Sequence, residues 1–351
     1  MSERFTEFDV RRVVVESEII TSFYLAPKTP LARDYVPGEY LLFEHAVAGA
    51  DPVRREYSIS GHDGDCLRVT IKREDAPEAT LPAGVMSTRF HTSIKEGDTV
   101  RAAGPKGKFT LNRTSSRPVV LLSGGVGITP MMAMAHELVE AGTRDVAFIH
   151  ACENGRVHAM GSEVRKLAAD NANMSAHFLY RTPDRQDRAG VDYDTHGMVD
   201  QALLETLLPA GECDFYLCGP GPFMQAMYDM LHDMGVATDR IQYEFFGPAS
   251  VLKPKGAAPK VASTNASGPQ ITFAKSGVTA GWDAESENLL EFAEDQGVMV
   301  DYSCRAGTCT TCKTKVLSGT VAYPIPPFEQ PEDGYALLCC SKPDGDLELD
   351  V

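Results

Sequence analysis

Nine cysteines are the residues of this 351-residue chain whose spacing most clearly points to chemistry. Three of them, Cys304, Cys309 and Cys312, lie within the stretch CRAGTCTTC and follow a C-x4-C-x2-C pattern. The adjacent pair Cys339 and Cys340 comes later in the chain. Thiolates are good ligands for soft transition metals, and the small residues between these cysteines allow the tight loop that three converging thiolates require. The pattern therefore predicts a metal centre.

Cysteines at this spacing are typical of the plant-type [2Fe–2S] loop, in which a fourth thiolate comes from elsewhere in the chain. A structural zinc site is the alternative, although zinc sites more usually show paired C-x2-C units. Disulfides are less favoured, because the N-terminus MSERFTEFDV lacks the apolar core of a signal peptide and so indicates a cytoplasmic protein. The spacing leaves the fourth ligand open between Cys339 and Cys340. Four further cysteines are scattered, and core packing is their expected role: Cys66, Cys152, Cys213 and Cys218.

Two glycine-rich loops each follow a short apolar run that is predicted to be a β-strand. The first is GVGITP at 125–130 and the second is CGPGP at 218–222. Ligands bind at the carboxyl ends of strands in open α/β sheets, and a helix that starts there favours phosphate. Either loop alone is a weak signal, since a tight turn would explain it. Two such loops in one sheet favour a nicotinamide-nucleotide site.

A second group of residues has the types that contact a flavin. Arg55, Tyr57 and Ser58 form an R-x-Y-S motif that offers a cation, an aromatic face and a hydroxyl. A surface strand is the alternative explanation of this motif. Gly84 and Ser87 lie at a predicted helix start, where backbone N–H groups can bind a pyrophosphate.

The surrounding pattern divides the chain into parts that would position these groups. Residues 1–113 show short alternating strands between Pro/Gly turns, which predicts a small antiparallel barrel. Residues 114–247 alternate strand-like and helix-like segments, which predicts a parallel sheet with helices on both faces. Residues 248–269 are rich in Pro, Ala, Gly, Ser and Lys and are expected to form a flexible linker. Residues 270–351 then form a separate small module.

The charge is concentrated in that module. Residues 270–351 hold 14 acidic and five basic residues, so they carry −9 of the net charge of −16. An acidic protein is a poor candidate for binding nucleic acid, and its macromolecular partner would carry a basic patch. No apolar run approaches the roughly 20 residues of a membrane span, so we expect no membrane association.

Taken in order, the motifs R-x-Y-S, G-x-x-S, G-x-G-x-x-P and C-G-P resemble the ferredoxin–NADP⁺ reductase superfamily. Within it, the body is most similar to the reductase part of flavohaemoglobins, as the stretches REYSIS, GGVGITPM, HACENG, YLCGPGPFMQ and YEFFGP indicate. With its ferredoxin-like module, the whole chain resembles the reductase components of Rieske-type and related oxygenases. The resemblance implies a multidomain fold with an antiparallel β-barrel flavin domain, an α/β parallel-sheet nucleotide domain and an α+β (β-grasp) ferredoxin domain.

The resemblance also implies roles for individual residues. Those expected to hold the flavin are Arg55, Tyr57, Ser58, Ile71, Lys72, Gly84, Met86, Ser87 and Phe246. Those expected to bind the nicotinamide nucleotide are Gly125, Gly127, Thr129, Pro130, Gly219 and Pro220. Those expected to take part in catalysis are Ser58, Cys218, Glu244 and Phe246, the last across the flavin face, with core packing as its alternative. In ferredoxins the fourth ligand usually precedes a proline by four positions, which selects Cys339 ahead of Pro343 and completes a set with Cys304, Cys309 and Cys312.

The implied activity is NAD(P)H-dependent electron transfer through a flavin and a [2Fe–2S] cluster to a separate terminal oxygenase with a basic docking patch. FAD is the expected flavin, with FMN as the alternative. NADH is preferred over NADPH, because Glu153 follows the second strand of the nucleotide domain and would suit a free ribose. Two other functions stay open. The same chain of cofactors could serve another acceptor such as a hybrid-cluster protein, or the protein could be a non-catalytic redox sensor.

Overall fold

The structure is a computed structural model that describes residues 5–47, 49, 52–76, 83–246, 252, 268–302, 305, 307–324 and 326–351. These residues form two compact units, a body that includes residues 5–246 and a C-terminal unit from residue 268 onward. Cys304 and most of the expected linker lie outside the described residues. Three residues of that expected linker are described, namely Leu252, Gly268 and Pro269. Leu252 is buried against the core of the body, and the Pro269 carbonyl accepts a hydrogen bond from the Trp282 N–H in the C-terminal unit.

The first half of the body is a closed antiparallel barrel with the strand order β1-β2-β5-β4-β3-β6. Its elements are β1 (Thr6–Val15), β2 (Ile20–Pro27), β3 (Tyr40–His45), β4 (Val53–Asp63), β5 (Cys66–Lys72), α1 (Val85–Thr92) and β6 (Thr99–Lys106). Alternate residues of β5 fill the barrel core, as the alternating sequence predicted. The opposite face of β5 is also buried, because its Arg68 and Thr70 contact the second half of the body.

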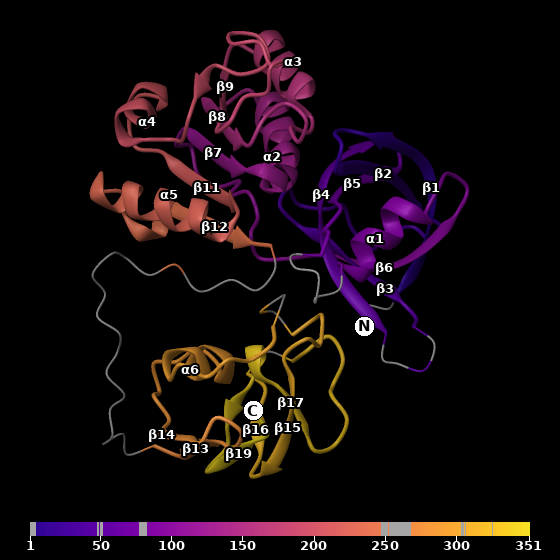
Figure 1. The fold of residues 1–351 in the computed structure, drawn as a ribbon, viewed down its shortest axis with the longest axis vertical. Helices are drawn as coiled ribbons and strands as arrows, with labels where there is room; N and C mark the ends of the chain where they lie inside the picture. The colour runs from indigo at the N-terminus through magenta and orange to yellow at the C-terminus, as the bar shows by residue number, and fades with distance from the viewer. Residues whose placement is uncertain are drawn as a thin grey trace. The chain divides into compact units, whose positions relative to one another are not determined.

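The second half of the body is a parallel sheet with the strand order β10-β9-β8-β7-β11-β12 (Figure 1). Its strands are β7 (Val119–Gly124), β8 (Val146–Cys152), β9 (Met174–Tyr180), β10 (Thr195–His196), β11 (Asp214–Gly219) and β12 (Ile241–Phe245). Its helices are η1 (Gly125–Gly127), α2 (Ile128–Ala141), α3 (Gly161–Asp170), α4 (Gln201–Leu207), α5 (Gly221–Asp233) and η2 (Thr238–Arg240). Helices α2 and α3 cover one face, and α4 and α5 cover the other, each over its own apolar core. The predicted barrel and the predicted parallel sheet are both confirmed.

The barrel packs directly on the sheet domain. Gly38 of the barrel lies so close to the Phe109 carbonyl and to Met134 of α2 that a Cβ there would collide with both. Beside this contact, Arg68 of β5 donates to both carboxylate oxygens of Glu163 in α3, at 2.7 and 3.0 Å. These contacts hold the two halves of the body together as one unit.

The C-terminal unit is a mixed sheet covered by one helix, with the strand order β14-β13-β19-β15-β17. Its elements are β13 (Gln270–Phe273), β14 (Val278–Gly281), α6 (Leu289–Asp295), β15 (Lys313–Ser318), β16 (Val321–Ala322), β17 (Tyr335–Leu337), η3 (Leu338–Cys340), β18 (Lys342–Pro343) and β19 (Leu347–Leu349). Asn288 caps α6 by accepting a hydrogen bond from the Glu291 N–H, and the apolar face of this helix is buried. Among the described helices of the whole chain, none is long and apolar enough to cross a membrane.

Candidate functional site

The two glycine loops meet at the carboxyl edge of the parallel sheet. A Cβ on Gly127 would collide with the Cys218 carbonyl, and a Cβ on Gly219 would lie 3.0 Å from the Gly124 nitrogen. Gly125 has φ +52°, a left-handed conformation that glycine adopts without steric cost. The backbones of the two loops therefore approach each other as no larger residue would allow. The sequence analysis identified Gly125, Gly127 and Gly219 but not Gly124. The only signal for Gly124 was its place as the first glycine of the GGVG run.

Each loop leads into a helix long enough to offer a phosphate site. Helix α2 begins at Ile128 with Thr129 and Pro130 in its first turn, and α5 begins directly after Pro220. Thr129 is buried, and its hydroxyl donates to the Val126 carbonyl at 3.1 Å. Both helices direct their N-terminal, positive dipole ends to the same edge, an arrangement that suits a dinucleotide pyrophosphate.

The R-x-Y-S motif lies on β4, one strand of the barrel. Ser58 is buried, Tyr57 is half-buried and Arg55 is exposed. The Tyr57 ring packs on Phe43 and Phe90, with ring centroids 5.7 Å apart in both cases, and burial raises the pKa of its hydroxyl. The motif thus presents one exposed cation beside a fixed aromatic ring and a hydroxyl, as a flavin site would require.

A second barrel segment joins the end of β5 to the start of α1. The Gly84 N–H donates to the Glu74 carbonyl at 2.8 Å, and the Ser87 hydroxyl donates to the Gly84 carbonyl at 3.1 Å. A Cβ on Gly84 would lie 2.7 Å from the Ser87 Oγ, so glycine is required for this close turn. The helix starts where the sequence predicted it. Three other expected flavin residues surround this turn, namely Met86 and Ile71, which are buried, and Lys72, which is paired with Glu74 at 3.0 Å.

Glu244 is the most perturbed carboxyl group at this edge. It lies on β12 directly beside Cys218 of β11 in the parallel register. Although the residue as a whole is only half-buried, its Oε2 is shielded from solvent and accepts no hydrogen bond from any residue that the structure describes. Burial, followed by the charge of Glu56, raises the pKa of Glu244 to about 8. Burial also raises the pKa of the neighbouring Cys218 thiol, so this thiol is neutral.

The effect of Glu56 on Glu244 connects the two halves of the site. Glu56 lies between Arg55 and Tyr57 on β4, so its charge acts from the R-x-Y-S strand on the nucleotide edge of the sheet. The Glu56 carboxylate is therefore near enough to Glu244 to influence its protonation. Phe246, which follows β12, is 40% exposed and so is not part of the core, and its position against a flavin stays a prediction.

The structure describes four cysteines of the C-terminal unit, namely Cys309, Cys312, Cys339 and Cys340. Cys309, Cys312 and Cys339 are buried, and the Cys339 Sγ accepts a hydrogen bond from the Gly307 N–H at 3.2 Å. Cys340 is only half-buried, and its thiol donates to the Leu337 carbonyl at 3.6 Å. A backbone N–H aimed at a buried sulfur suits an iron–sulfur ligand, whose negative charge it would stabilise.

The full ligand set stays a prediction, because Cys304 is outside the described residues. Within the part of the chain that the structure describes, no three His, Cys, Asp or Glu side chains gather closely enough to hold a metal ion. Of the four cysteines expected to be core residues, Cys213 and Cys218 are buried, whereas Cys66 and Cys152 are half-buried.

Comparison with known proteins matches three domain families along the chain. Residues 8–111 match the oxidoreductase FAD-binding domain, residues 121–229 the oxidoreductase NAD-binding domain, and residues 271–344 the 2Fe-2S iron-sulfur cluster binding domain. FAD, NAD and a [2Fe–2S] cluster are therefore the cofactors of this family architecture. The close approach of the two glycine loops and the shielded Glu244 oxygen, which has no partner among the described residues, fit the binding of the flavin and the nucleotide.

The body is similar to the flavohemoprotein of Bacillus thuringiensis subsp. konkukian, with 39% identity over 253 residues, which are 71% of this chain and 62% of the relative. It is also similar to the flavohemoprotein of Chromobacterium violaceum, with 42% identity over 245 residues, which are 68% of this chain and 60% of the relative. The chain thus spans about three fifths of the length of these relatives. Among solved structures, it is similar to the FAD/NAD-binding domain of a nitric oxide dioxygenase from Vibrio cholerae, with 36% identity, a TM-score of 0.61, and coverage of 69% of this chain and 99% of that one.

A similarity in fold also extends over almost the entire chain. Phthalate dioxygenase reductase covers 99% of this chain, which in turn covers 98% of that protein, with a TM-score of 0.56 and 22% identity. The chain belongs to the FAD- and NAD-binding oxidoreductase family that includes the reductase part of flavohaemoproteins, and it carries a 2Fe-2S domain after that body.

Proposed function

We propose that this protein is the NADH-dependent reductase component of an oxygenase system, which delivers electrons to a separate terminal oxygenase of the Rieske type. The observation that supports this most is the order of its three domains, which is shared along almost the whole length of phthalate dioxygenase reductase. When bound, a flavin supplies the exchange between the two-electron hydride chemistry of NADH and the one-electron chemistry of an iron–sulfur cluster.

The residues of the body have distinct roles in this proposal. Arg55, Tyr57 and Ser58 hold and orient the flavin from β4, while the turn at Gly84 and Ser87 binds its pyrophosphate through backbone N–H groups. The two glycine loops hold the nicotinamide nucleotide with its reactive ring toward β4. At neutral pH Glu244 is protonated, so it can donate a hydrogen bond, and hold a proton, on β12 beside Cys218.

Charge around the expected ribose site favours NADH. Three arginines that follow β8 and β9 are each paired with a carboxylate: Arg156 with Glu18 at 3.0 Å, Arg181 with Glu153 at 3.7 Å, and Arg188 with Asp192 at 3.2 Å. A 2′-phosphate would have to compete with these carboxylates for its cations. The exposed Glu153 can instead accept hydrogen bonds from a ribose hydroxyl.

The C-terminal unit has a surface suited to a basic partner. Residues 283–301 contain seven acidic residues and no basic residue, and α6 within this segment packs beside η3, which carries Cys339. Met299 in the same segment is 89% exposed and offers an apolar contact among the carboxylates. Such a surface would steer a basic oxygenase toward the cluster, at a rate that falls as salt rises.

An anaerobic titration with NADH tests the proposal at its first stage. We expect flavin absorbance to bleach at substoichiometric NADH while an electron paramagnetic resonance signal of a reduced [2Fe–2S] cluster appears. Reconstitution with candidate terminal oxygenases then tests the second stage. Rapid reduction of a hybrid-cluster protein but of no oxygenase would overturn the proposed partner, and an NADH-inert protein would overturn the reductase activity itself.

A further inference from the structure

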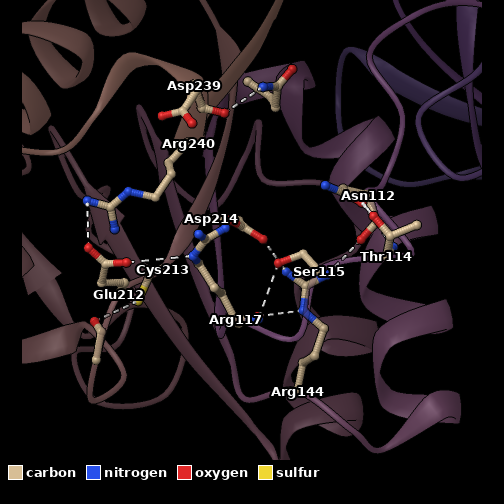
Figure 2. Close-up of polar contacts among 12 residues, drawn as sticks. Asn112, Thr114, Ser115, Arg117, Arg144, Glu212, Cys213, Asp214, Asp239 and Arg240 are labelled. Atoms are coloured by element: carbon tan, nitrogen blue, oxygen red, sulfur yellow. Dashed lines mark hydrogen bonds and ion pairs between the residues drawn. The ribbon is translucent and has the colours of Figure 1, made fainter.

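A buried arginine holds the segment that joins the barrel to the sheet domain. This connector, residues 112–118, lies between β6 and β7. Figure 2 shows Arg144 among residues of the connector, with Asp214 nearby. The Arg144 guanidinium donates to the Asn112 carbonyl at 3.0 Å and to the Arg117 carbonyl, and it pairs with the Asp214 carboxylate at 2.7 Å. Arg144 is 7% exposed, so these charge-assisted hydrogen bonds are shielded from water. One side chain thus fastens both ends of the connector to the first residue of β11.

Tyr216 adds a second attachment on the same strand. Its hydroxyl accepts a hydrogen bond from the Asn112 N–H at 2.8 Å, and its ring packs on Phe109 with centroids 5.8 Å apart. The Tyr216 side chain is fully buried between the sheet and α2. We call Arg144, Asp214 and Tyr216 together the bracket.

The bracket connects the two parts of the candidate site through a short path. On the barrel side, Leu111, the residue before Asn112, donates from its N–H to the Pro37 carbonyl at 3.0 Å. Two residues after Pro37, the Glu39 carbonyl accepts a hydrogen bond from the Ile59 N–H at 2.8 Å. Ile59 directly follows the R-x-Y-S motif on β4. On the sheet side, β11 runs from the bracket at Asp214 to the nucleotide loop at Gly219, a rise of about 16 Å.

We propose that Arg144, Asp214 and Tyr216 are positioning residues for hydride transfer, because they fix the distance and angle between the flavin strand β4 and the nucleotide loop that follows β11. This inference rests on the NADH-to-flavin step of the proposed function. None of the three residues lies at the edge of the sheet where the ligands would bind. Their effect is on geometry, and displacing reacting atoms by about 1 Å can cost on the order of a hundredfold in rate.

The two halves of the body have an independent attachment, which makes the inference testable. The Arg68–Glu163 pair and the contact of Gly38 with α2 do not involve the bracket. Tyr216→Phe, which removes one hydroxyl and keeps the ring, should therefore leave the halves joined but less well aligned. Asp214→Asn is a second variant that removes the charge from the Arg144 pair and keeps its shape.

The experiment is anaerobic stopped-flow reduction of the bound flavin by NADH and by NADH deuterated at the transferred position. For both variants we expect the limiting rate of flavin reduction to fall by roughly tenfold or more and the isotope effect on that rate to increase. The apparent dissociation constant for NADH should stay within about twofold of wild type. The matched control is Tyr323→Phe, which removes a hydroxyl that accepts a hydrogen bond from the Leu337 N–H in the C-terminal unit. The control should leave the limiting rate unchanged.

The possible results separate the inference from the function on which it rests. Limiting rates within twofold of wild type for both variants, with lower melting temperatures alone, would show a purely structural role and overturn the inference. A wild-type protein whose flavin NADH does not reduce would overturn the proposed function and the role of the bracket with it. The choice of terminal acceptor does not affect this test, because flavin reduction needs no oxygenase.

Discussion

Replacing Glu244 by glutamine should stabilise the body, by an amount that grows as pH rises. In the folded protein the pKa of Glu244 is raised from 4.5 to about 8, chiefly by burial. Between these two pH values the folded state keeps a proton that the unfolded state releases, so wild-type stability falls with rising pH. Glutamine has no proton to release, so the variant is spared this loss.

The size of the effect follows from the gap between the two pKa values. At about 1.4 kcal/mol per pH unit, the shift from 4.5 to about 8 corresponds to on the order of 4–5 kcal/mol above pH 8 and to very little at pH 4.5. Structural relaxation around a new charge would reduce this to about half. For a body of this size, roughly 2–4 °C per kcal/mol gives a melting-temperature gain of about 4–10 °C at pH 8.

The assay follows thermal release of the flavin by its own fluorescence at several pH values from 5 to 8.5, which reports unfolding of the body alone. The difference between Glu244→Gln and wild type should widen steadily with pH. Glu205→Gln removes an exposed carboxylate from α4 and serves as the control, with a difference that does not widen. A constant difference for Glu244→Gln across this range would refute the reasoning, and so would one that narrows with pH.

Three further predictions test other parts of the site. Gly127→Ala should raise the KM for NADH at least tenfold in steady-state assays, because its Cβ would collide with the backbone at the end of β11. Cys339→Ser should lose the cluster by iron content and visible absorbance, whereas Cys340→Ser should retain it, because the buried Cys339 sulfur is the one that accepts the loop N–H. Glu153→Gln should improve the kcat/KM for NADPH relative to NADH by roughly threefold to tenfold, because it removes the carboxylate from Arg181.

The sequence was sufficient to predict loops and helix starts, which depend on neighbouring residues. It was insufficient to predict contacts between segments that are far apart in the chain. Short apolar runs followed by glycine predicted both nucleotide loops, and the helix start at Gly84 followed from its motif, since all of these depend on neighbouring residues. The raised pKa of Glu244 depends on its burial on β12, beside β11, and on the charge of Glu56 from the barrel. No periodicity in the sequence carries that information.

The same limit applies to the contacts between the halves of the body. Arg68 alternates with apolar residues on β5, a pattern typical of a strand with one face in water. Its partner Glu163 is 95 residues away, and only the packing of α3 on the barrel turns that face into an interface. Arg144 lies in the loop between α2 and β8, and Asp214, 70 residues later, is the first residue of β11, so nothing in the sequence links them.

The position of β11 within the sheet explains why its first residues should matter at its far end. β11 pairs with β7 on one side and β12 on the other, so a shift of β11 must move both neighbours or break their hydrogen bonds. An edge strand has no such constraint. The hydrogen bond between His177 of β9 and Thr195 of the edge strand β10, at 2.9 Å, is within 0.1 Å of the one that Tyr216 accepts, at 2.8 Å. Thr195→Val should nevertheless leave the limiting rate of flavin reduction unchanged, because β10 can adjust alone. A rate loss as large as that of Tyr216→Phe would mean that the sheet domain responds to any polar deletion, and that the position of β11 has no special role.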